Sequence, residues 1–252
     1  MGTNIGAKER VTQNRLIGLF RRVLKYTYLG NWEKRDGNSN VEEKYLSAYF
    51  ARRGYTDKEI SSAIAKLKQA AGSLGGGLYN ANKEVYTLLR YGVNVQAEVT
   101  EKKKMVHLID WANPMENDFQ IAEEVTIHGT SDRRPDLVVY VNGIALAVIE
   151  LKRSTVSAHE GIRQNIRNQQ DGYIPRFFTT IQLLFAGNDT EGLHYGVIKT
   201  PEKFWLRWKE PCGDPCAKPH FTAEEYPNEL DRSMLQFFEP ARLLEYIHDF
   251  II

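Results

Sequence analysis

The order of apolar and polar residues divides the chain into a mainly helical first part and a strand-rich second part. Residues 11–28 repeat apolar positions near helical spacing and carry basic residues on the other faces, which predicts an amphipathic basic helix. The same spacing, with Asn40 as a cap before the first of them, predicts helices over 41–53, 57–71 and 82–92. From Val93 onward the period changes to two, and strands are expected over 93–99, 105–109, 119–127, 136–141, 144–152, 181–185 and 194–198.

A further helix, predicted over 158–171, lies between the fifth and sixth of these strands. This order of elements is typical of an α/β protein, here with one sheet flanked by helices. The last residues, 250–252, end an apolar helical pattern without a polar stop. Because such an ending exposes apolar surface, we expect the chain to be a piece of a larger protein.

Composition excludes several classes of protein. With 42% hydrophobic and 26% charged residues in 252, the chain can bury a core and is not expected to be disordered. It lacks both the roughly 18 to 20 uninterrupted apolar residues of a spanning helix and the apolar stretch of a signal peptide. Its two cysteines cannot form a disulfide framework. We therefore expect a cytoplasmic protein with no membrane partner.

Charge is segregated along the chain, although the formal net charge is only +1. Residues 1–37 hold 8 Lys and Arg against 3 Asp and Glu, whereas residues 209–252 hold 4 against 9. A polyanionic partner is therefore expected at the first part of the chain. The basic helix over 11–28 is a candidate for nonspecific phosphate contacts.

The most informative stretch is RRPDLVVYVNGIALAVIELK, two apolar strands joined by Asn142-Gly143. This dipeptide is the strongest short signal for a hairpin. Asp136 opens the first strand, and Glu150 and Lys152 lie two residues apart on the second, so the latter two share a face of the sheet. The apolar strands leave these three charged residues at the strand ends.

The register of the hairpin decides whether the two carboxylates meet. A strict two-residue turn would put Asp136 on the face opposite to that of Glu150. A three-residue loop with Gly143 in the left-handed region would instead put Asp136 opposite Val148, as a diagonal same-face neighbour of Glu150. We predict this second register.

Two carboxylates so placed can converge on one hard cation, for which Mg²⁺ is the natural choice. Lys152 would reach the same place and could orient or help deprotonate an attacking water, or stabilise charge on a phosphate. Ordinary solvated charges at strand ends are the alternative interpretation. The sequence Pro135-Asp136, the tight turn and the apolar strands favour the metal site.

The predicted helix over 158–171 adds a second candidate group. Gln169 and Tyr173 are four residues apart and would share one face, beside the metal site. Arg163 and Arg167 lie on a neighbouring face and are candidates for phosphate contacts. The alternative is that Tyr173 only packs against apolar residues of the same helix.

These residues resemble the D…ExK…QxxxY signature of the PD-(D/E)xK nuclease in HsdR, the restriction subunit of type I restriction-modification enzymes. The resemblance extends over nearly the whole chain, through NRLIGLFRRVLKYTYLGNW, NVEEKYLSAYFARRGY, YNANKEVYTLLRYGVNV, LIDWANPMENDF and the GLHYGVI region. It implies a restriction-endonuclease-like mixed sheet flanked by helices, with a helical N-terminal region. The implied activity is that of a type I site-specific deoxyribonuclease.

The resemblance also implies roles for single residues. Asp136 and Glu150 would be metal ligands, the Leu151 carbonyl a further ligand, and Lys152 the catalytic lysine. Gln169 and Tyr173 would be the accessory motif needed for cleavage. The implied cofactor is Mg²⁺, with Mn²⁺ as a substitute. Related nucleases often add a carboxylate from an early helix, and either Glu42 or Glu43 is a candidate for that place, although surface glutamates are the favoured interpretation.

The rest of such an enzyme would lie outside this chain. We expect a basic helical segment over 1–37, the nuclease domain over 38–210, and an acidic segment over 211–252 that leads to motor domains absent here. Those motors would use ATP to translocate double-stranded DNA, and this chain contains no GxxxxGK[ST] loop for ATP. Methyltransferase and specificity subunits are the implied protein partners, and unmethylated foreign DNA the implied substrate.

Two alternatives stay open, a non-catalytic docking or DNA-binding module and a freestanding nuclease of the same superfamily. Metal binding separates the first from an enzyme, because two carboxylates on one face repel each other without a cation. Cys212, Cys216 and His220 offer no convincing fourth zinc ligand. Structural roles are expected for the remaining candidates: His107, His128, His194, Trp205 and Trp208.

Overall fold

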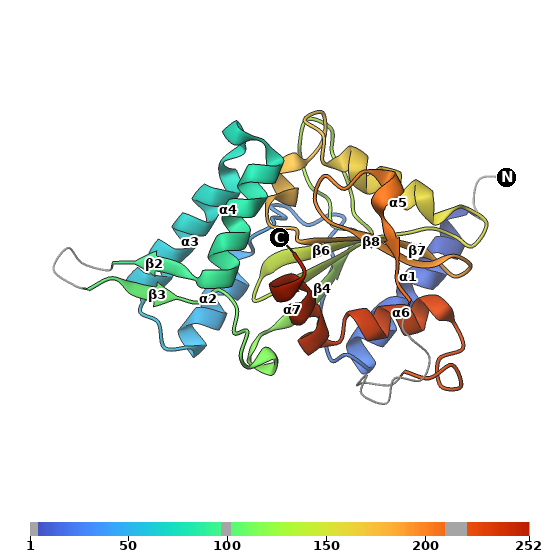
Figure 1. The fold of residues 1–252 in the computed structure, drawn as a ribbon, viewed down its shortest axis with the longest axis horizontal. Coiled ribbons are helices and arrows are strands. Elements are labelled where there is room, and N and C mark those ends of the chain that lie inside the picture. Colours follow the sequence, from blue (N-terminus) through green and yellow to red (C-terminus); the bar gives the residue numbers. More distant parts are fainter. Residues whose placement is uncertain (1–4, 97–101, 210–220, 252) are drawn as a thin grey trace.

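A seven-stranded mixed sheet forms the centre of the protein (Figure 1). The computed structural model describes residues 5–96, 102–209 and 221–251, with side chains from Arg10 onward. The strands of the sheet are β1 (Thr27–Asn31), β4 (Phe119–Glu123), β5 (Leu137–Val141), β6 (Ile144–Leu151), β7 (Leu183–Asn188), β8 (Gly192–Gly196) and β9 (Leu206–Arg207). The helices are α1 (Ile5–Arg22), α2 (Glu43–Arg52), α3 (Asp57–Gly72), α4 (Leu78–Tyr91), α5 (Ala158–Asn168), α6 (Glu229–Phe237) and α7 (Pro240–Asp249).

The strand order in the sheet is β1-β4-β5-β6-β7-β8-β9. The β1–β4 and β6–β7 pairs are parallel, and the other neighbours are antiparallel. The parallel pairing of β6 with β7 requires a crossover, and α5 supplies it. This arrangement confirms the predicted α/β class with a mixed sheet flanked by helices.

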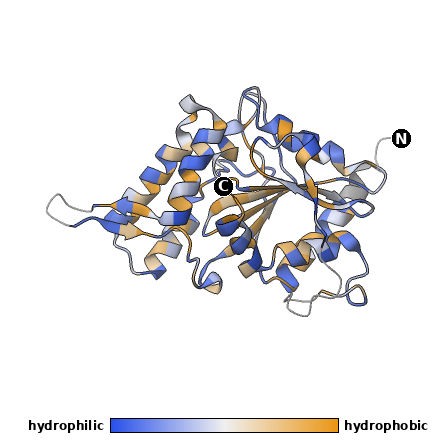
Figure 2. Ribbon diagram, viewed as in Figure 1, coloured by the Kyte–Doolittle hydropathy of each residue, from blue (hydrophilic) through white to orange (hydrophobic). Residues whose placement is uncertain are grey.

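Both faces of the sheet are covered, because every residue of β4, β5, β6 and β7 is buried. Helix α5 lies on one face, and α1, α6 and α7 lie on the other (Figure 1). Hydropathy colouring shows the apolar residues gathered on the central strands, with hydrophilic residues on the outer sides of the helices (Figure 2). The sheet is therefore a buried platform that can hold a charged group only at its strand ends.

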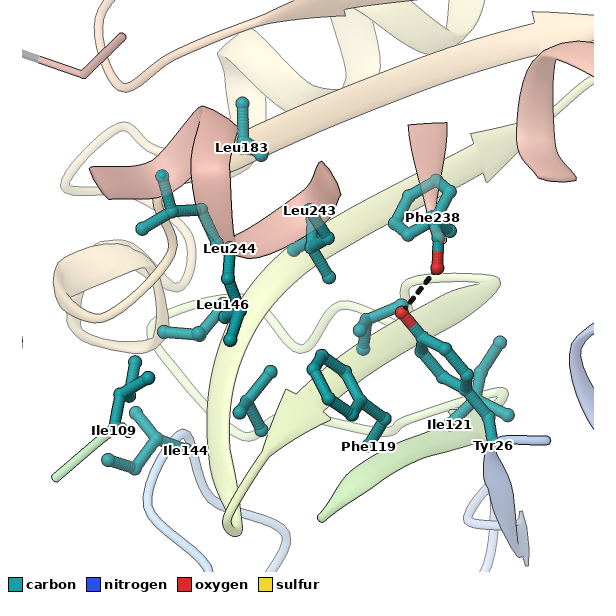
Figure 3. Packing of buried hydrophobic residues seen from close by; sticks show 14 of the residues in the cluster. Tyr26, Ile109, Phe119, Ile121, Ile144, Leu146, Leu183, Phe238, Leu243 and Leu244 are labelled. Atoms are coloured by element: carbon teal, nitrogen blue, oxygen red, sulfur yellow. Dashed lines mark hydrogen bonds between the residues drawn. The ribbon is translucent and has the colours of Figure 1, made fainter. Parts of the chain in front are cut away.

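The larger core lies on the face covered by α1, α6 and α7, and it joins parts of the chain that are far apart in sequence. The Tyr26 hydroxyl donates a buried hydrogen bond of 2.8 Å to the Phe238 carbonyl (Figure 3). The two aromatic rings both pack against Phe20 of α1, with centroids 5.1 Å away in each case. The C-terminal helices are thus part of the same core as the N-terminal helix.

Helices α2, α3 and α4 gather at one end of the sheet (Figure 1). A small hairpin of β2 (Val93–Val95) and β3 (Lys104–Val106) lies with them and is separate from the central sheet. Placing these two strands in the main sheet was therefore wrong. Short 3₁₀ helices complete the connections: η1 (Leu74–Gly76), η2 (Pro114–Glu116), η3 (Pro175–Thr179) and η4 (Glu202–Phe204).

The prediction of a single helix over 11–28 was wrong at its C-terminal end. Helix α1 ends at Arg22, and Lys25 has a left-handed φ of 62°, which helices do not tolerate. The chain then forms β1, an edge strand that the period of apolar residues did not reveal. Asn40 is not a helix cap either, because its side chain bonds to the Arg176 carbonyl and the Thr179 hydroxyl instead.

Candidate active site

The β5–β6 hairpin turns through two residues. Asn142 and Gly143 both have positive φ values, 53° and 80°, and Val141 pairs directly with Ile144. Two central residues with positive φ are the mark of a type I′ turn, which matches the twist of the flanking strands. The predicted three-residue loop was therefore wrong.

A bulge in β6 brings the carboxylates to one face instead. Tyr140 pairs with Ala145 but Val139 pairs with Ala147, so one extra residue, Leu146, is inserted in β6. The pairing beyond the bulge is shifted by one position, and Leu137 pairs with Ile149. The next positions along the two strands are those of Asp136 and Glu150. Asp136 therefore lies level with Glu150, not opposite Val148 as predicted, and the same-face arrangement comes from the bulge.

Glu150 is fully buried beneath α5, with 0% of its surface exposed. Gln164 of α5 donates a hydrogen bond of 2.6 Å from its Nε2 to Glu150 Oε2. A Cβ on Gly161 would lie 3.4 Å from the Glu150 Cβ, so the helix packs closely over this strand. The other carboxylate oxygen, Oε1, is buried and has no hydrogen-bond partner in the described part of the chain. The site thus leaves one buried oxygen without a donor, which is costly unless a cation or water satisfies it.

The pKa of the Glu150 carboxyl is raised well above its usual range. Burial is the largest cause, and the charge of the Asp136 carboxylate is the second. Lys152 acts in the opposite direction because its positive charge favours the ionised form, and the more distant Glu124 raises the pKa further. The two carboxylates are therefore close enough to oppose each other's ionisation, as expected of a pair that shares one positive ligand.

Asp136 is held by backbone groups on both sides. Its Oδ2 accepts a hydrogen bond of 2.7 Å from the Leu151 N–H, and its carbonyl accepts one of 2.9 Å from the Glu124 N–H. The Gln13 amide of α1 also donates to the Asp136 carbonyl, at 3.3 Å. Leu151 thus contributes its N–H to the position of Asp136, and the role of its carbonyl as a metal ligand, which the resemblance implies, stays a prediction. The Lys152 N–H bonds to the Gly187 carbonyl of β7 at 2.9 Å, which fixes the start of this side chain.

The predicted accessory pair does not share a helical face. Helix α5 ends at Asn168, so Gln169 is the C-cap residue and Tyr173 lies in the following turn. The Gln169 side chain donates to the Asn165 carbonyl and accepts from the Lys199 N–H at 2.8 Å. The prediction that these two residues lie beside each other on a helix was wrong.

The amide that contacts the site is that of Gln164, which the sequence reasoning missed. Gly161, Gln164 and Asn168 lie three to four residues apart and form the stripe of α5 toward the sheet. Helical spacing counted from the small residue Gly161 would have found Gln164, whereas the letters QxxxY pointed to Gln169, whose side chain bonds elsewhere.

The family described as type I restriction enzyme R protein N terminus (HSDR_N) matches residues 6–203. This chain belongs to that family. The match includes every strand of the central sheet except β9, and it includes the whole β5–β6–α5 unit that holds the candidate site. The resemblance seen in the sequence is thereby confirmed for the family and for the endonuclease part of the R subunit.

Curated relatives agree with the R-subunit family. A protein of Methanocaldococcus jannaschii, provisionally named type I restriction enzyme MjaIXP endonuclease subunit, is 26% identical over 68% of this chain and 18% of its own length. The SsaAORF53P endonuclease subunit of Staphylococcus saprophyticus is 26% identical over 53% of this chain and 13% of its own length. The chain therefore spans less than a fifth of these R-subunit relatives.

No helix within the described residues is long and apolar enough to cross a membrane.

Two of the arginines expected to meet DNA in this R-subunit domain are paired with carboxylates. Arg163 pairs with Glu160 at 2.7 Å and with Glu202 at 3.0 Å. In α1, Arg15 forms ion pairs with Asp189 and Asp231. Arg167, one turn after Arg163, is exposed and has no carboxylate within 4 Å in the described ranges.

Neither early glutamate lies beside the carboxylate pair. The Glu42 carboxylate is bound by Arg35 at 2.6 Å, and its N–H donates to the Gly143 carbonyl, at the turn end of the hairpin. Glu43 is exposed and pairs with Lys68. Because Asp136 lies at the other end of β5, both glutamates lie at the end of the sheet away from the carboxylate pair.

The remaining candidates have structural roles or fall outside the described ranges. Cys212, Cys216 and His220 lie outside the described residues. Trp205 and Trp208 are each 8% exposed and pack in the core, as expected. His128 pairs with Asp132 on the surface, and the His194 ring is partly buried. The domain division at residues 37 and 210 stays a prediction.

The chemistry of the carboxylate pair suits a bound divalent cation. Its donor set is oxygen only, as Mg²⁺ and Mn²⁺ prefer, and it leaves the buried Oε1 of Glu150 without a partner. No group of three or more His, Cys, Asp or Glu side chains in metal-binding geometry occurs among the described residues. Two carboxylates with several waters or phosphate oxygens is the usual arrangement for Mg²⁺, so the pair is sufficient.

Proposed function

We propose that this domain is a metal-dependent DNA endonuclease that hydrolyses phosphodiester bonds, with Asp136 and Glu150 as the metal ligands. One observation carries the proposal: a β-bulge brings a second carboxylate level with a fully buried one, and both oppose each other's ionisation. A bound cation relieves this repulsion while both carboxylates stay ionised.

A bound Mg²⁺ would supply the positive charge that stabilises a phosphate oxygen and lowers the pKa of a water molecule. Asp136, held by the Leu151 N–H, and the unpartnered Glu150 Oε1 would supply oxygen ligands to the cation. Gln164 holds Glu150 Oε2 and so fixes the direction of Oε1. The Lys152 ammonium, whose charge acts on the same carboxylate, stabilises negative charge on the phosphate.

The wider activity is proposed on family membership. The domain would act as the R subunit of a type I restriction enzyme, cleaving unmethylated foreign DNA after ATP-driven translocation by motor domains outside this chain. Methyltransferase and specificity subunits would be its partners. Arg167 is a candidate for a phosphate contact. Gln169 and Tyr173 keep a proposed accessory role, in which they would hold the turn that follows α5 in shape.

A calorimetric titration with Mn²⁺ tests the proposal on the whole 252-residue chain. We expect saturable binding to the wild type, and its loss in Asp136→Asn and in Glu150→Gln, because each change removes one anionic ligand. Glu160→Gln is the matched control, since it removes an exposed carboxylate from α5, one residue before Gly161.

Each outcome has a distinct meaning. Binding that survives in both ligand variants would overturn the assignment of Asp136 and Glu150. Absence of wild-type binding at millimolar Mn²⁺, with all variants folded, would favour a docking module without catalysis. Loss of binding in Glu160→Gln would show that the titration reports surface charge instead of a site.

A further inference from the structure

A groove of about 450 Å³ lies beyond the C-terminal end of α5, outside the carboxylate pair. Its walls come from the loop between β4 and β5 and from the turn between α5 and η3. The side chains that matter here are those of His128, Thr130, Tyr173 and Arg176. The groove is open to solvent, and its lining mixes polar groups, among them Asp171, with aliphatic side chains and the two aromatic rings of Tyr173 and Phe177.

The two walls are locked together. The Thr130 N–H donates to the Tyr173 carbonyl at 3.2 Å, and the Thr130 hydroxyl donates to the Asp171 carbonyl. A Cβ on Gly129 would lie only 2.3 Å from the Tyr173 carbonyl oxygen, so only glycine allows this contact. The groove is therefore built by specific contacts between two segments.

Arg133 lies against the ring of Tyr173, a residue that lines the groove. Its guanidinium carbon lies 4.1 Å from the centroid of the Tyr173 ring, in cation–π geometry. A backbone bridge with Ile127 fixes the position of Arg133, through hydrogen bonds of 2.8 and 3.0 Å. Arg133 is thus held in place by a ring and by the backbone, with its charge left available.

Arg133 and Arg176 differ from the arginines that ion pairs neutralise. Arg10, Arg35, Arg53, Arg134, Arg163 and Arg207 each form ion pairs with carboxylates. Arg133 and Arg176 have no carboxylate within 4 Å in the part of the chain that the structure describes. Because the net charge is only +1, attraction of a polyanion depends on such local unpaired charges.

Arg133 lies near the carboxylate pair along the chain, whereas Arg176 lies toward the turn end of the β5–β6 hairpin. Arg133 precedes Asp136 by three residues, and three residues span at most about 10 Å. Phosphates along one DNA strand advance by about 3.4 Å each along the helix axis. A strand lying on Arg133 would therefore place a phosphate about three nucleotides away within reach of Asp136.

We propose that Arg133 and Arg176 bind backbone phosphates of one duplex DNA that extends across the carboxylate pair, with Arg133 nearer the scissile bond and Tyr173 as the platform that orients Arg133. This inference rests on the proposed nuclease function and names the surface that holds its substrate. It transfers the phosphate contacts from Arg163, which two glutamates neutralise, to the other end of α5.

The test is a salt titration of DNA binding. A fluorescein-labelled duplex of about 20 base pairs and arbitrary sequence is bound to the 252-residue chain in EDTA, and fluorescence anisotropy gives the affinity between about 50 and 200 mM KCl. Each lost phosphate contact lowers the slope of log K against log salt by about 0.9 and lowers the affinity at the lowest salt about tenfold. We expect these losses in Arg133→Gln and Arg176→Gln, and about twice the slope change in the double variant.

Matched controls separate the groove from general charge. Arg163→Gln removes the same charge from a neutralised site and should leave the slope unchanged, and Arg133→Lys should keep the slope because it keeps the charge. An unchanged slope in the double variant, or an equal loss in Arg163→Gln, would overturn the proposal. Binding only of single-stranded DNA or RNA would overturn its duplex ligand.

The same titration distinguishes this inference from the nuclease proposal. Asp136→Asn and Glu150→Gln should keep the full salt slope, because neither residue carries a phosphate contact in EDTA. Intact Mn²⁺ binding in Arg133→Gln together with an unchanged slope would refute the groove and leave the nuclease site standing. A lost slope with no Mn²⁺ binding in the wild type would support the groove and refute the nuclease site.

Discussion

Replacing Glu150 by glutamine should stabilise the protein in the absence of metal while abolishing metal binding. The introduced amide can still accept the hydrogen bond from Gln164 through its carbonyl oxygen, and its NH₂ group can donate to the Asp136 carboxylate. The change therefore converts a buried repulsion into a hydrogen bond of about the same shape. A loss of function with a gain in stability is the expected signature of a strained ligand pair.

The magnitude follows from Coulomb's law. Directly opposite positions on neighbouring strands lie about 5 Å apart. Two unit charges at that distance repel by about 3 kcal/mol at an effective dielectric constant of about 20. For a chain of this size, about 1 kcal/mol shifts the midpoint of thermal unfolding by about 2 to 4 °C, so Glu150→Gln should raise it by roughly 6 to 12 °C in EDTA at a pH where both carboxyls are ionised.

The pH dependence of the protein's stability gives a second, independent test of this repulsion. Because the pKa of Glu150 is raised in the folded state, the folded protein holds this proton more tightly than the unfolded chain does. The contribution of Glu150 to stability is therefore lost as pH rises from the ordinary glutamate range, near 4.5, through the raised folded pKa. The advantage of Glu150→Gln should be small at pH 4.5 and should grow toward about pH 8.

Differential scanning fluorimetry in EDTA and in MnCl₂ measures both effects. Mn²⁺ at about 100 times its dissociation constant should stabilise the wild type by about 2.7 kcal/mol and leave Glu150→Gln unchanged. A Glu150→Gln variant that is less stable than the wild type in EDTA at high pH would refute the buried repulsion. A stability difference that does not grow with pH would refute it equally. Glu160→Gln, with an exposed carboxylate, is the control for the effect of charge alone.

Four further substitutions test the packing around the site and core. Gln164→Ala should weaken Mn²⁺ binding about tenfold by calorimetry, because a ligand loses its supporting hydrogen bond, and a wild-type affinity would contradict this role. Gln169→Ala should instead cost about 1 to 3 kcal/mol in urea unfolding with Mn²⁺ affinity retained, because it removes buried hydrogen bonds. Gly161→Ala should cost about 1 to 3 kcal/mol and weaken Mn²⁺ binding, because a Cβ there would press α5 away from the sheet. Tyr26→Phe should cost about 1 to 3 kcal/mol, since it leaves the buried Phe238 carbonyl without its donor, and unchanged urea unfolding would refute this.

Patterns along the chain were enough to predict the class of fold and the three charged residues at the site. Buried strands show as continuous apolar runs, so the charges of Asp136, Glu150 and Lys152 stand out against them. The Asn142-Gly143 turn is equally visible, because few other residues adopt two successive positive φ values. These features are local, and local conformational preference is what a sequence displays.

Features that depend on contacts between distant segments were decided only in the folded structure. The bulge at Leu146 has no marker in a strand of apolar residues, yet it alone sets Asp136 level with Glu150. The end of α5 at Asn168 likewise decides that Gln164, not Gln169, reaches the buried carboxylate. Whether an arginine is free for a phosphate depends on which carboxylates fold against it, as the ion pairs of Arg163 show. Register, helix ends and charge pairing depend on how segments pack against one another. The hydrophobic period of a single segment does not determine that packing.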